Sequence, residues 1–283
     1  MASIAHLSDV HFGRHDPVIV EAVERFLDER RPDLVVISGD FTQRARVAQY
    51  ELACQFVERI EGSGLPVLAV PGNHDVPLYD VVRRFVRPLH RYKRFIDDDL
   101  CPYFENEEMA VLGINTARSL TIKDGSVSYE QMARIRTGFS AVSADKIRIL
   151  VTHHPLFAMP LGEEGALTEV ADRSNDALTA ASEAGVDMLL AGHFHRSFSK
   201  SAREMVDQAG PALVIQAGTA TSTRLRGDEQ QSFNWIEAGK DQVQLQVLAW
   251  SDGRFQSSNP ARFTYDGDNW HSAPAEAAAV TAT

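Results

Sequence analysis

Short apolar segments alternate with longer amphipathic ones over the first two thirds of this 283-residue chain. The short segments are bounded by Pro, Gly, Asp or Asn and predict buried strands, whereas the longer ones carry apolar residues at helical spacing. This alternation predicts an α/β layered core. The expected strands are Ile4–Ser8, Leu34–Ser38, Val67–Val70, Ala110–Ile114, Ile147–Thr152 and Met188–Ala191, and the expected helices are Val18–Arg30, Ala45–Ile60, Tyr79–Phe95, Tyr129–Thr137 and Asn175–Ala184.

The pattern changes after residue 210. Ala212–Ala217, Phe233–Glu237 and Gln242–Trp250 resemble consecutive strands with no helix between them. We therefore expect a second sheet or an antiparallel extension of the first one.

The charge of the chain excludes some functions. With 28 Lys+Arg against 39 Asp+Glu, the net charge is −11. Binding of long nucleic acid requires clustered cations, so the charge argues against it, and an anionic membrane surface is disfavoured for the same reason.

Other features indicate an ordinary globular chain. No stretch approaches the roughly 18 apolar residues of a membrane span, and no leader pattern precedes the first strand. We therefore expect no integral membrane association and a cytoplasmic location. Cys54 and Cys101 have no metal-ligand spacing and are expected to be reduced thiols.

Residues of the types that bind metal ions follow five of the expected strands. Taken singly, each motif could be ordinary: Asp9 and His11 could be exposed loop residues, and Asp40 could cap the helix expected near Arg44. Together, however, the motifs hold six of the 10 histidines. They are Asp9-Val10-His11, Gly39-Asp40, Gly72-Asn73-His74-Asp75, His153-His154-Pro155 and Gly192-His193-Phe194-His195.

The positions of these motifs predict a metal site. Residues two apart in an extended backbone point to the same side, which would bring Asp9 together with His11 and His193 together with His195. The carboxyl ends of strands in an α/β sheet share one edge, where such folds build sites. Mixed oxygen and imidazole ligands suit Zn, Fe or Mn, and there are more ligands than one ion uses. We therefore expect two metal ions.

In content and order, the five motifs resemble those of calcineurin-like metallophosphoesterases, and most closely the bacterial cyclic-nucleotide and glycerophosphodiester branch. The resemblance implies a four-layer α-β-β-α sandwich. It also implies one domain over residues 1–265, after which we expect a disordered tail over residues 266–283 because the final residues are almost all small.

The resemblance also assigns roles to residues. His74 would contact the phosphoryl group or the leaving oxygen, and Asp75 would orient His74. His153 is preferred to His154 as the ligand because it stands directly at the strand end. One metal would be held by Asp9, His11, Asp40 and His195, and the other by Asp40, Asn73, His153 and His193, so that Asp40 bridges the two.

The implied activity is hydrolysis of a small phosphodiester. Two adjacent cations can lower the pKa of a shared water and supply a bridging hydroxide that attacks phosphorus. Arg14, His154 and Arg44 are candidate substrate-binding residues, as is the segment Thr219–Arg224. The loop Leu156–Arg173 could be a lid or an ordinary connection.

Three alternatives remain open. Phosphomonoesterases and UDP-diacylglucosamine-type pyrophosphatases share the metal residues, and the arginine-rich segment Tyr79–Phe95 would suit a lid over acyl chains. A non-catalytic metal-binding scaffold is the third. The expected partner is a small phosphoester substrate, and the sequence leaves open whether the chain forms a homo-oligomer.

Overall fold

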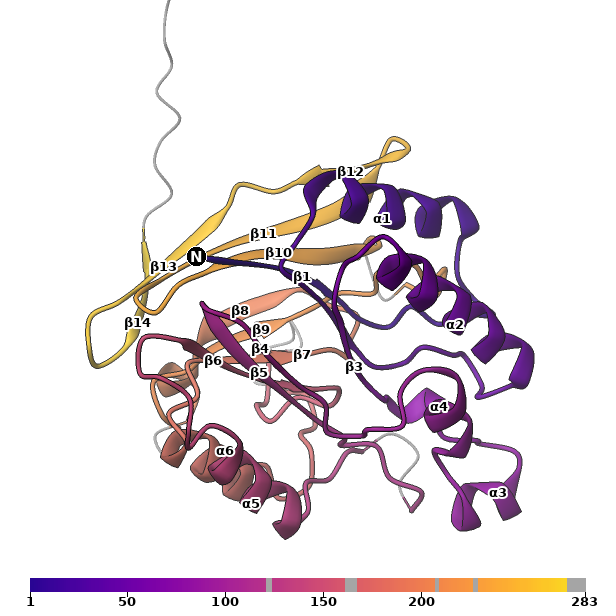
Figure 1. The fold of residues 1–283 in the computed structure, drawn as a ribbon, viewed down its shortest axis with the longest axis horizontal. Helices are drawn as coiled ribbons and strands as arrows, with labels where there is room; N and C mark the ends of the chain where they lie inside the picture. The colour runs from indigo at the N-terminus through magenta and orange to yellow at the C-terminus, as the bar shows by residue number, and fades with distance from the viewer. Residues whose placement is uncertain (121–123, 161–166, 207–208, 226–228, 274–283) are drawn as a thin grey trace, which may run out of the picture.

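The computed structural model describes residues 1–120, 124–160, 167–206, 209–225 and 229–273. Two β-sheets lie face to face between two helical layers, as the family resemblance of the sequence implied (Figure 1). The first sheet has eight strands in the order β14 (Trp270–Ala273), β13 (Ala261–Tyr265), β11 (Gln242–Ser251), β10 (Ser232–Ala238), β1 (Ala2–Leu7), β2 (Leu34–Ser38) and β3 (Val67–Val70), with β12 (Arg254–Ser257) paired to β11.

The second sheet has six strands. β5, β6, β7 and β9 run parallel, whereas β4 and β8 pair antiparallel at the two edges. Their order is β4 (Tyr103–Glu105), β5 (Met109–Ile114), β6 (Ile147–Thr152), β7 (Met188–Ala191), β9 (Leu213–Gln216) and β8 (Phe198–Ser201).

Helices cover the outer face of each sheet, and two further short helices lie at one end of the molecule, the second of them packed against a helix that covers the first sheet (Figure 1). α1 (Pro17–Arg30) and α2 (Val47–Gly62) lie over the first sheet, α5 (Tyr129–Gly138) and α6 (Ser174–Glu183) over the second, and α3 (Val81–Val86) and α4 (His90–Phe95) beyond the end of α2 (Figure 1). Two single-turn 3₁₀ helices, η1 (Asn73–Asp75) and η2 (Ala202–Glu204), complete the described elements.

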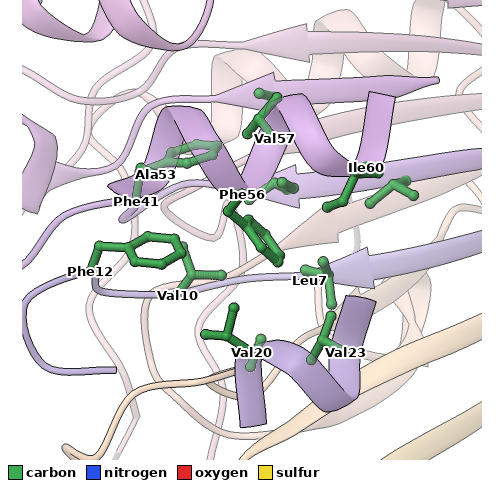
Figure 2. Packing of buried hydrophobic residues seen from close by; sticks show 14 of the residues in the cluster. Leu7, Val10, Phe12, Val20, Val23, Phe41, Ala53, Phe56, Val57 and Ile60 are labelled. Carbon is green, nitrogen blue, oxygen red and sulfur yellow. The ribbon is translucent and has the colours of Figure 1, made fainter. Parts of the chain in front are cut away.

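Three apolar cores separate the four layers. Along β2, Leu34 and Val36 face the core between the sheets, while Val35 and Ile37 face the core beneath α1 and α2. Both faces of this strand are buried, so it is a continuous apolar run, as buried parallel strands require. Figure 2 shows the core beneath α1 and α2, where Phe12, Phe41 and Phe56 pack together.

The expected helix Tyr79–Phe95 is two short helices instead. α3 ends at Val86 and α4 begins at His90. Pro88 lacks a backbone N–H and disfavours helical geometry at the residue before it, and Arg87 has φ −147° and ψ 64°. The expectation of one continuous helix was wrong for this reason.

The expected disorder of residues 266–283 was wrong at its beginning. Trp270 belongs to β14, pairs with Tyr265 of β13, and is only 1% exposed. This aromatic side chain contributes to the core between the sheets, which explains why the strand is held there. Residues 274–283 lie outside the described part of the chain.

No helix among the described residues is long and apolar enough to cross a membrane.

Candidate metal centre

The five motifs follow strands whose carboxyl ends meet between the two sheets. β1, β2 and β3 are parallel neighbours in the first sheet, and β6 and β7 are parallel neighbours in the second. Each motif therefore begins where a parallel strand leaves its sheet. The facing edges bring residues from position 9 to position 195 into one cluster.

The ligand-type residues converge through left-handed backbone conformations. Asp9, His11, Asp40, His193 and His195 have φ values of 52°, 49°, 55°, 83° and 57°. The expectation that alternation in an extended backbone aligns these pairs was therefore wrong, because each chain segment turns sharply after its strand. Non-glycine residues rarely adopt this region, and strain of this kind concentrates at functional sites.

The first donor group joins β1, β2 and the segment after β7. Its candidate ligand atoms are Asp9 Oδ1, His11 Nε2, Asp40 Oδ2 and His195 Nε2. His195 Nε2 lies 3.1 Å from both Asp9 Oδ1 and His11 Nε2, and His11 Nε2 lies 3.6 Å from both carboxylates.

The second donor group uses the other oxygen of Asp40. His153 Nε2 lies 3.5 Å from Asp40 Oδ1 and 3.1 Å from Asn73 Oδ1. His193 Nδ1 lies 3.1 Å from Asn73 Oδ1 and 3.3 Å from His153 Nε2. Asp40 thus presents one carboxylate oxygen to each group. It does not cap a helix, because Arg46 occupies the N-cap position of α2.

Neighbouring groups orient the donors. Ser8 Oγ and the His193 backbone N–H donate to Asp9 Oδ2 at 2.6 and 2.9 Å, which leaves Asp9 Oδ1 to face the first group. His153 Nδ1 donates to the Ser38 carbonyl at 2.7 Å, and His195 Nδ1 donates to the Arg224 carbonyl at 3.1 Å. These bonds set the tautomers so that each Nε2 presents a lone pair to the site, a recurrent feature of metal-binding histidines.

The charges of the cluster suit a cation. Burial raises the pKa of Asp9, but His195 and His11 outweigh burial and hold it well below its usual value. Burial also raises the pKa of Asp40, and the imidazoles around it, His153 foremost, lower it overall. Burial lowers the pKa of His11. Ionised carboxylates and neutral imidazoles are the forms that bind metal ions.

Two motif glycines make room for this cluster. A Cβ on Gly72 would overlap the carboxylate of Asp40, and a Cβ on Gly39 would lie 2.5 Å from the His153 ring. Gly39 also has a φ of 91°, which a side chain would strain. Both glycines are therefore required by close approach to donor residues.

The donor set fits two metal ions. Asp9 Oδ1 is fully buried and makes no hydrogen bond within the described residues, which costs free energy unless a cation contacts it. The described residues contain three groups whose ligand atoms lie within 4.8 Å of one another: Asp9, His11 and His195; Asp9, Asp40 and His153; and His153, His154 and His193.

His74 lies beside the donors, but Asp75 does not orient its ring. His74 Nδ1 donates to the Gln43 carbonyl at 2.8 Å, and the His74 ring meets the His11 ring edge-on at 4.8 Å. The Asp75 carboxylate instead accepts hydrogen bonds from the backbone N–H groups of Phe41, Thr42 and Gly72 at 2.9 to 3.2 Å. The expected role of Asp75 was therefore wrong, and Asp75 joins the loops that carry Asp40 and Asn73.

Burial, with Asp40 nearby, raises the pKa of Asp75 to about 7.

A cavity of ≈ 430 Å³ opens beside the donor groups. One wall comes from the described end of the loop Leu156–Arg173, at Leu167–Glu169. These described residues therefore form part of the site. The other lining residues are Asp40, Asn73, His74, His193, Phe194, His195 and Arg224.

A second cavity, of ≈ 240 Å³, adjoins the first. Asn73, His74 and Arg224 line both, so both cavities border the His74 side chain. The other lining residues are Gln43, Arg44, Val76, Leu78, Tyr79 and Arg84.

The three candidate substrate-binding residues have different positions. Arg44 lines the smaller cavity and stacks over the Tyr79 ring at 5.4 Å. His154 is buried against the His193 ring, and its Nδ1 lies 2.8 Å from Thr116 Oγ1. Arg14 is exposed and does not line either cavity. Of the three, only Arg44 lines one of these two cavities.

The sequence reasoning missed the residues that orient the donors and the His74 ring. Ser8, Ser38 and Gln43 act through a hydroxyl or a backbone carbonyl. Carbonyl acceptors have no side-chain signal, and only the position of Ser8 next to Asp9 could have indicated its role. Arg224, at the end of the segment Thr219–Arg224, contributes both a carbonyl and a cavity wall.

Comparisons of the sequence with known proteins identify relatives. The family model for calcineurin-like phosphoesterases matches residues 2–197. A probable cyclic nucleotide phosphodiesterase from Synechococcus is 25% identical over 225 residues, which are 76% of this chain and 81% of that protein. The glycerophosphodiester phosphodiesterase GpdQ from Enterobacter lignolyticus is 32% identical over 83 residues, which are 25% of this chain and 29% of that protein.

Solved structures share the fold. A purple acid phosphatase from yellow lupin superposes with a TM-score of 0.67 at 16% identity, over 90% of this chain and 52% of the lupin chain. This chain therefore spans about half the length of the lupin protein. A dimetal phosphatase from Danio rerio gives a TM-score of 0.60 at 12% identity, covering 90% and 98%.

Proposed function

This chain belongs to the calcineurin-like phosphoesterase family, and from that premise we propose that it is a phosphodiesterase with a dinuclear metal centre. Its substrate would be a small diester of the cyclic-nucleotide or glycerophosphodiester type. The observation that carries the proposal is the pair of donor groups that share Asp40 beside a cavity of ≈ 430 Å³. The names of two relatives support the choice of a diester.

In this proposal each donor group holds one cation, and Mn, Fe and Zn all suit the ligands. When bound, two such cations supply an activated water and neutralise charge on the phosphoryl oxygens. The first is held by Asp9, His11, Asp40 and His195, and the second by Asp40, Asn73, His153 and His193.

The protein supplies a proton donor for the leaving oxygen. The Nδ1–H of His74 is held by the Gln43 carbonyl, so Nε2 is the nitrogen left for the substrate. In the protonated ring, Nε2–H can donate to the alkoxide as the ester bond breaks. The Gln43 carbonyl that accepts the Nδ1–H is uncharged. Loss of the Nε2 proton from the His74 ring therefore breaks no ion pair.

The shape of the site supports a small diester. A volume of ≈ 430 Å³ is in the range of small-molecule pockets. Because both cavities border His74, each could take one of the two groups esterified to a phosphoryl centre beside that side chain. A monoester would need only one of these spaces.

The test combines metal analysis with a panel of substrates. The panel contains an aryl diester, an aryl monoester, cyclic AMP, a glycerophosphodiester and a UDP-linked pyrophosphate. We expect two metal ions per chain and the highest kcat/KM on one of the diesters. Asp40→Asn should abolish every rate, because Asp40 contributes to both groups.

A monoester or pyrophosphate rate above every diester rate would contradict the diesterase proposal. Metal binding without any hydrolysis would favour the scaffold alternative.

A further inference from the structure

α3 exposes apolar side chains on its outer face. Val81, Val82, Phe85 and Val86 are 60%, 75%, 55% and 69% exposed, and their spacing places them on adjoining turns. With Leu78 and Tyr79, they account for six of the 15 exposed large hydrophobic residues in the described part of the chain. Scattered exposed apolar residues are normal, but a contiguous group marks an interaction surface.

The inner face of α3 carries a charge instead. Arg84 is 6% exposed, and its guanidinium donates to the carbonyls of Ser119 and Pro77 at 2.7 and 3.1 Å. A helix on the surface of a water-soluble protein shows the opposite pattern, with its apolar stripe toward the core. The orientation of α3 is therefore specified by the Arg84 contacts, which hold the apolar side chains outward.

The segment around α3 and α4 is strongly cationic. Residues 79–95 contain six Lys and Arg and one acid, so their net charge is 6 − 1 = +5 in a chain of −11. The single acid, Asp80, pairs with Arg83 at 2.9 Å. The acidic run Asp97–Asp99 follows α4, and Asp99 lies 3.9 Å from Arg134.

A groove of ≈ 470 Å³ beside α4 is lined by Arg87 and Lys93 of this segment and by Arg118 from outside it. Within the described residues, Arg87 and Lys93 form no ion pair, and Arg118 donates to the neutral oxygens of Asn115, Ala117 and Gln131. The described residues that line the groove include no acid. They are Arg87, Pro88, Leu89, His90, Lys93, Leu100, Asn115, Ala117, Arg118 and Ser119.

We propose that α3 and α4 form a docking surface for an anionic lipid bilayer. The apolar face of α3 enters the interfacial region, and Arg87, Lys93 and Arg118 bind lipid phosphates. α3 lies at the periphery of the molecule, where it can reach a flat surface (Figure 1). The net charge of the chain disfavours an anionic membrane, but the charge that such a membrane meets here is positive.

A second copy of the chain fits this surface less well. A two-fold dimer would place the same patch on both sides of the contact, and the Arg87 and Lys93 side chains of the two copies would repel each other. An anionic lipid surface instead neutralises these charges. Val82, Phe85, Arg87 and Lys93 line neither cavity of the site, so the proposal does not depend on the proposed hydrolysis.

The test is sedimentation of the full chain with sucrose-loaded vesicles. One set is phosphatidylcholine alone, and the other contains about 30 mol% phosphatidylglycerol. We expect binding only to the anionic set, with a marked loss at about 1 M salt, where the screening length falls to about 3 Å. Arg87→Gln with Lys93→Gln should weaken partitioning about 25-fold, since each cation contributes about five-fold. The double substitution Val82→Ser with Phe85→Ser should abolish binding to the anionic vesicles.

Matched controls lie on other exposed surfaces of the molecule. Val18→Ser changes an apolar residue that is 61% exposed on α1, and Arg254→Glu reverses an exposed charge on β12. Neither should change binding. Thermal unfolding of every variant should match that of the parent, because the substituted side chains are exposed.

Equal sedimentation with neutral and anionic vesicles, or equal losses in the controls, would overturn the proposal. The proposal would also be overturned if the chain bound no vesicles and instead formed a concentration-dependent dimer that Val82→Ser with Phe85→Ser dissociated.

Discussion

The Ser8 hydroxyl provides a sharp test of the proposed metal centre. Ser8 Oγ lies 2.6 Å from Asp9 Oδ2, and the His193 backbone N–H donates to the same oxygen at 2.9 Å. Ser8→Ala removes the shorter bond without touching a ligand. The Asp9 carboxylate then loses one of these two restraints, so Oδ1 is less firmly directed toward His11 and His195.

The size of the effect follows from that single bond. A hydrogen bond to a charged group contributes about 1.5–3 kcal/mol. Loss of a hydrogen-bond partner of a metal-binding side chain weakens metal affinity about 10–100-fold, which corresponds to about 1.4–2.7 kcal/mol. The two ranges agree, so we expect Ser8→Ala to weaken one of the two metal-binding steps by about 10–100-fold.

The assay is a titration of the metal-free protein with Zn²⁺ or Mn²⁺ against a competing chelator. Ser3→Ala is the matched control, because Ser3 Oγ also donates to an aspartate, Asp33, at 2.8 Å, but at the opposite end of β1. It should leave both binding steps unchanged. Wild-type affinity in Ser8→Ala, or an equal loss in Ser3→Ala, would refute the reasoning.

Three further predictions concern single positions. His74→Ala should lower kcat about 10²–10⁴-fold with unchanged metal content. The loss of kcat should be smaller for a substrate with an aryl leaving group than for one with an alkyl leaving group. Loss of metal in this variant would instead identify His74 as a metal ligand. Gly72→Ala should reduce metal content, measured by mass spectrometry, because its Cβ overlaps the Asp40 carboxylate, whereas Gly62→Ala has open space and should bind metal normally. Trp270→Ala should lower the free energy of unfolding by about 3–5 kcal/mol in urea, and a shift below about 1 kcal/mol would show that β14 contributes little to the core.

Most of the central architecture could be predicted from the sequence. The parallel strands β1, β2, β3, β6 and β7 are mostly apolar and are buried on both faces, a pattern typical of strands between two layers. The edge strands β4 and β8 are short and partly exposed, so they lack that signal. Trp270 was missed because a single aromatic near small residues does not reveal which surface it covers.

The chemical composition of the site was also predictable, but its geometry was not. The Asp, Asn and His residues stand out by type and by position after strands. Their spacing suggests extended alternation, whereas the structure uses left-handed turns. Adjacency in the sequence suggests that Asp75 partners His74, yet the Asp75 carboxylate bonds to the segment 41–42 instead.

The local charge of α3 and α4 shows the same division. The net charge of −11 is a property of composition, and it hides a segment of +5. The apolar residues of this segment look like an ordinary amphipathic helix in sequence. Only packing of Arg84 against backbone carbonyls turns them outward.

The sequence by itself determined which donors the chain offers and which strands carry them, because residue type and apolar periodicity are local properties. The tertiary structure alone decided that Asp40 gives one oxygen to each donor group and that Ser8, Ser38 and Arg224 aim the ligands. The contacts around this site join residues as far apart as 210 positions, as between Asp9 and Thr219. They form only when the two sheets bring their strand ends together, so no local pattern can encode them.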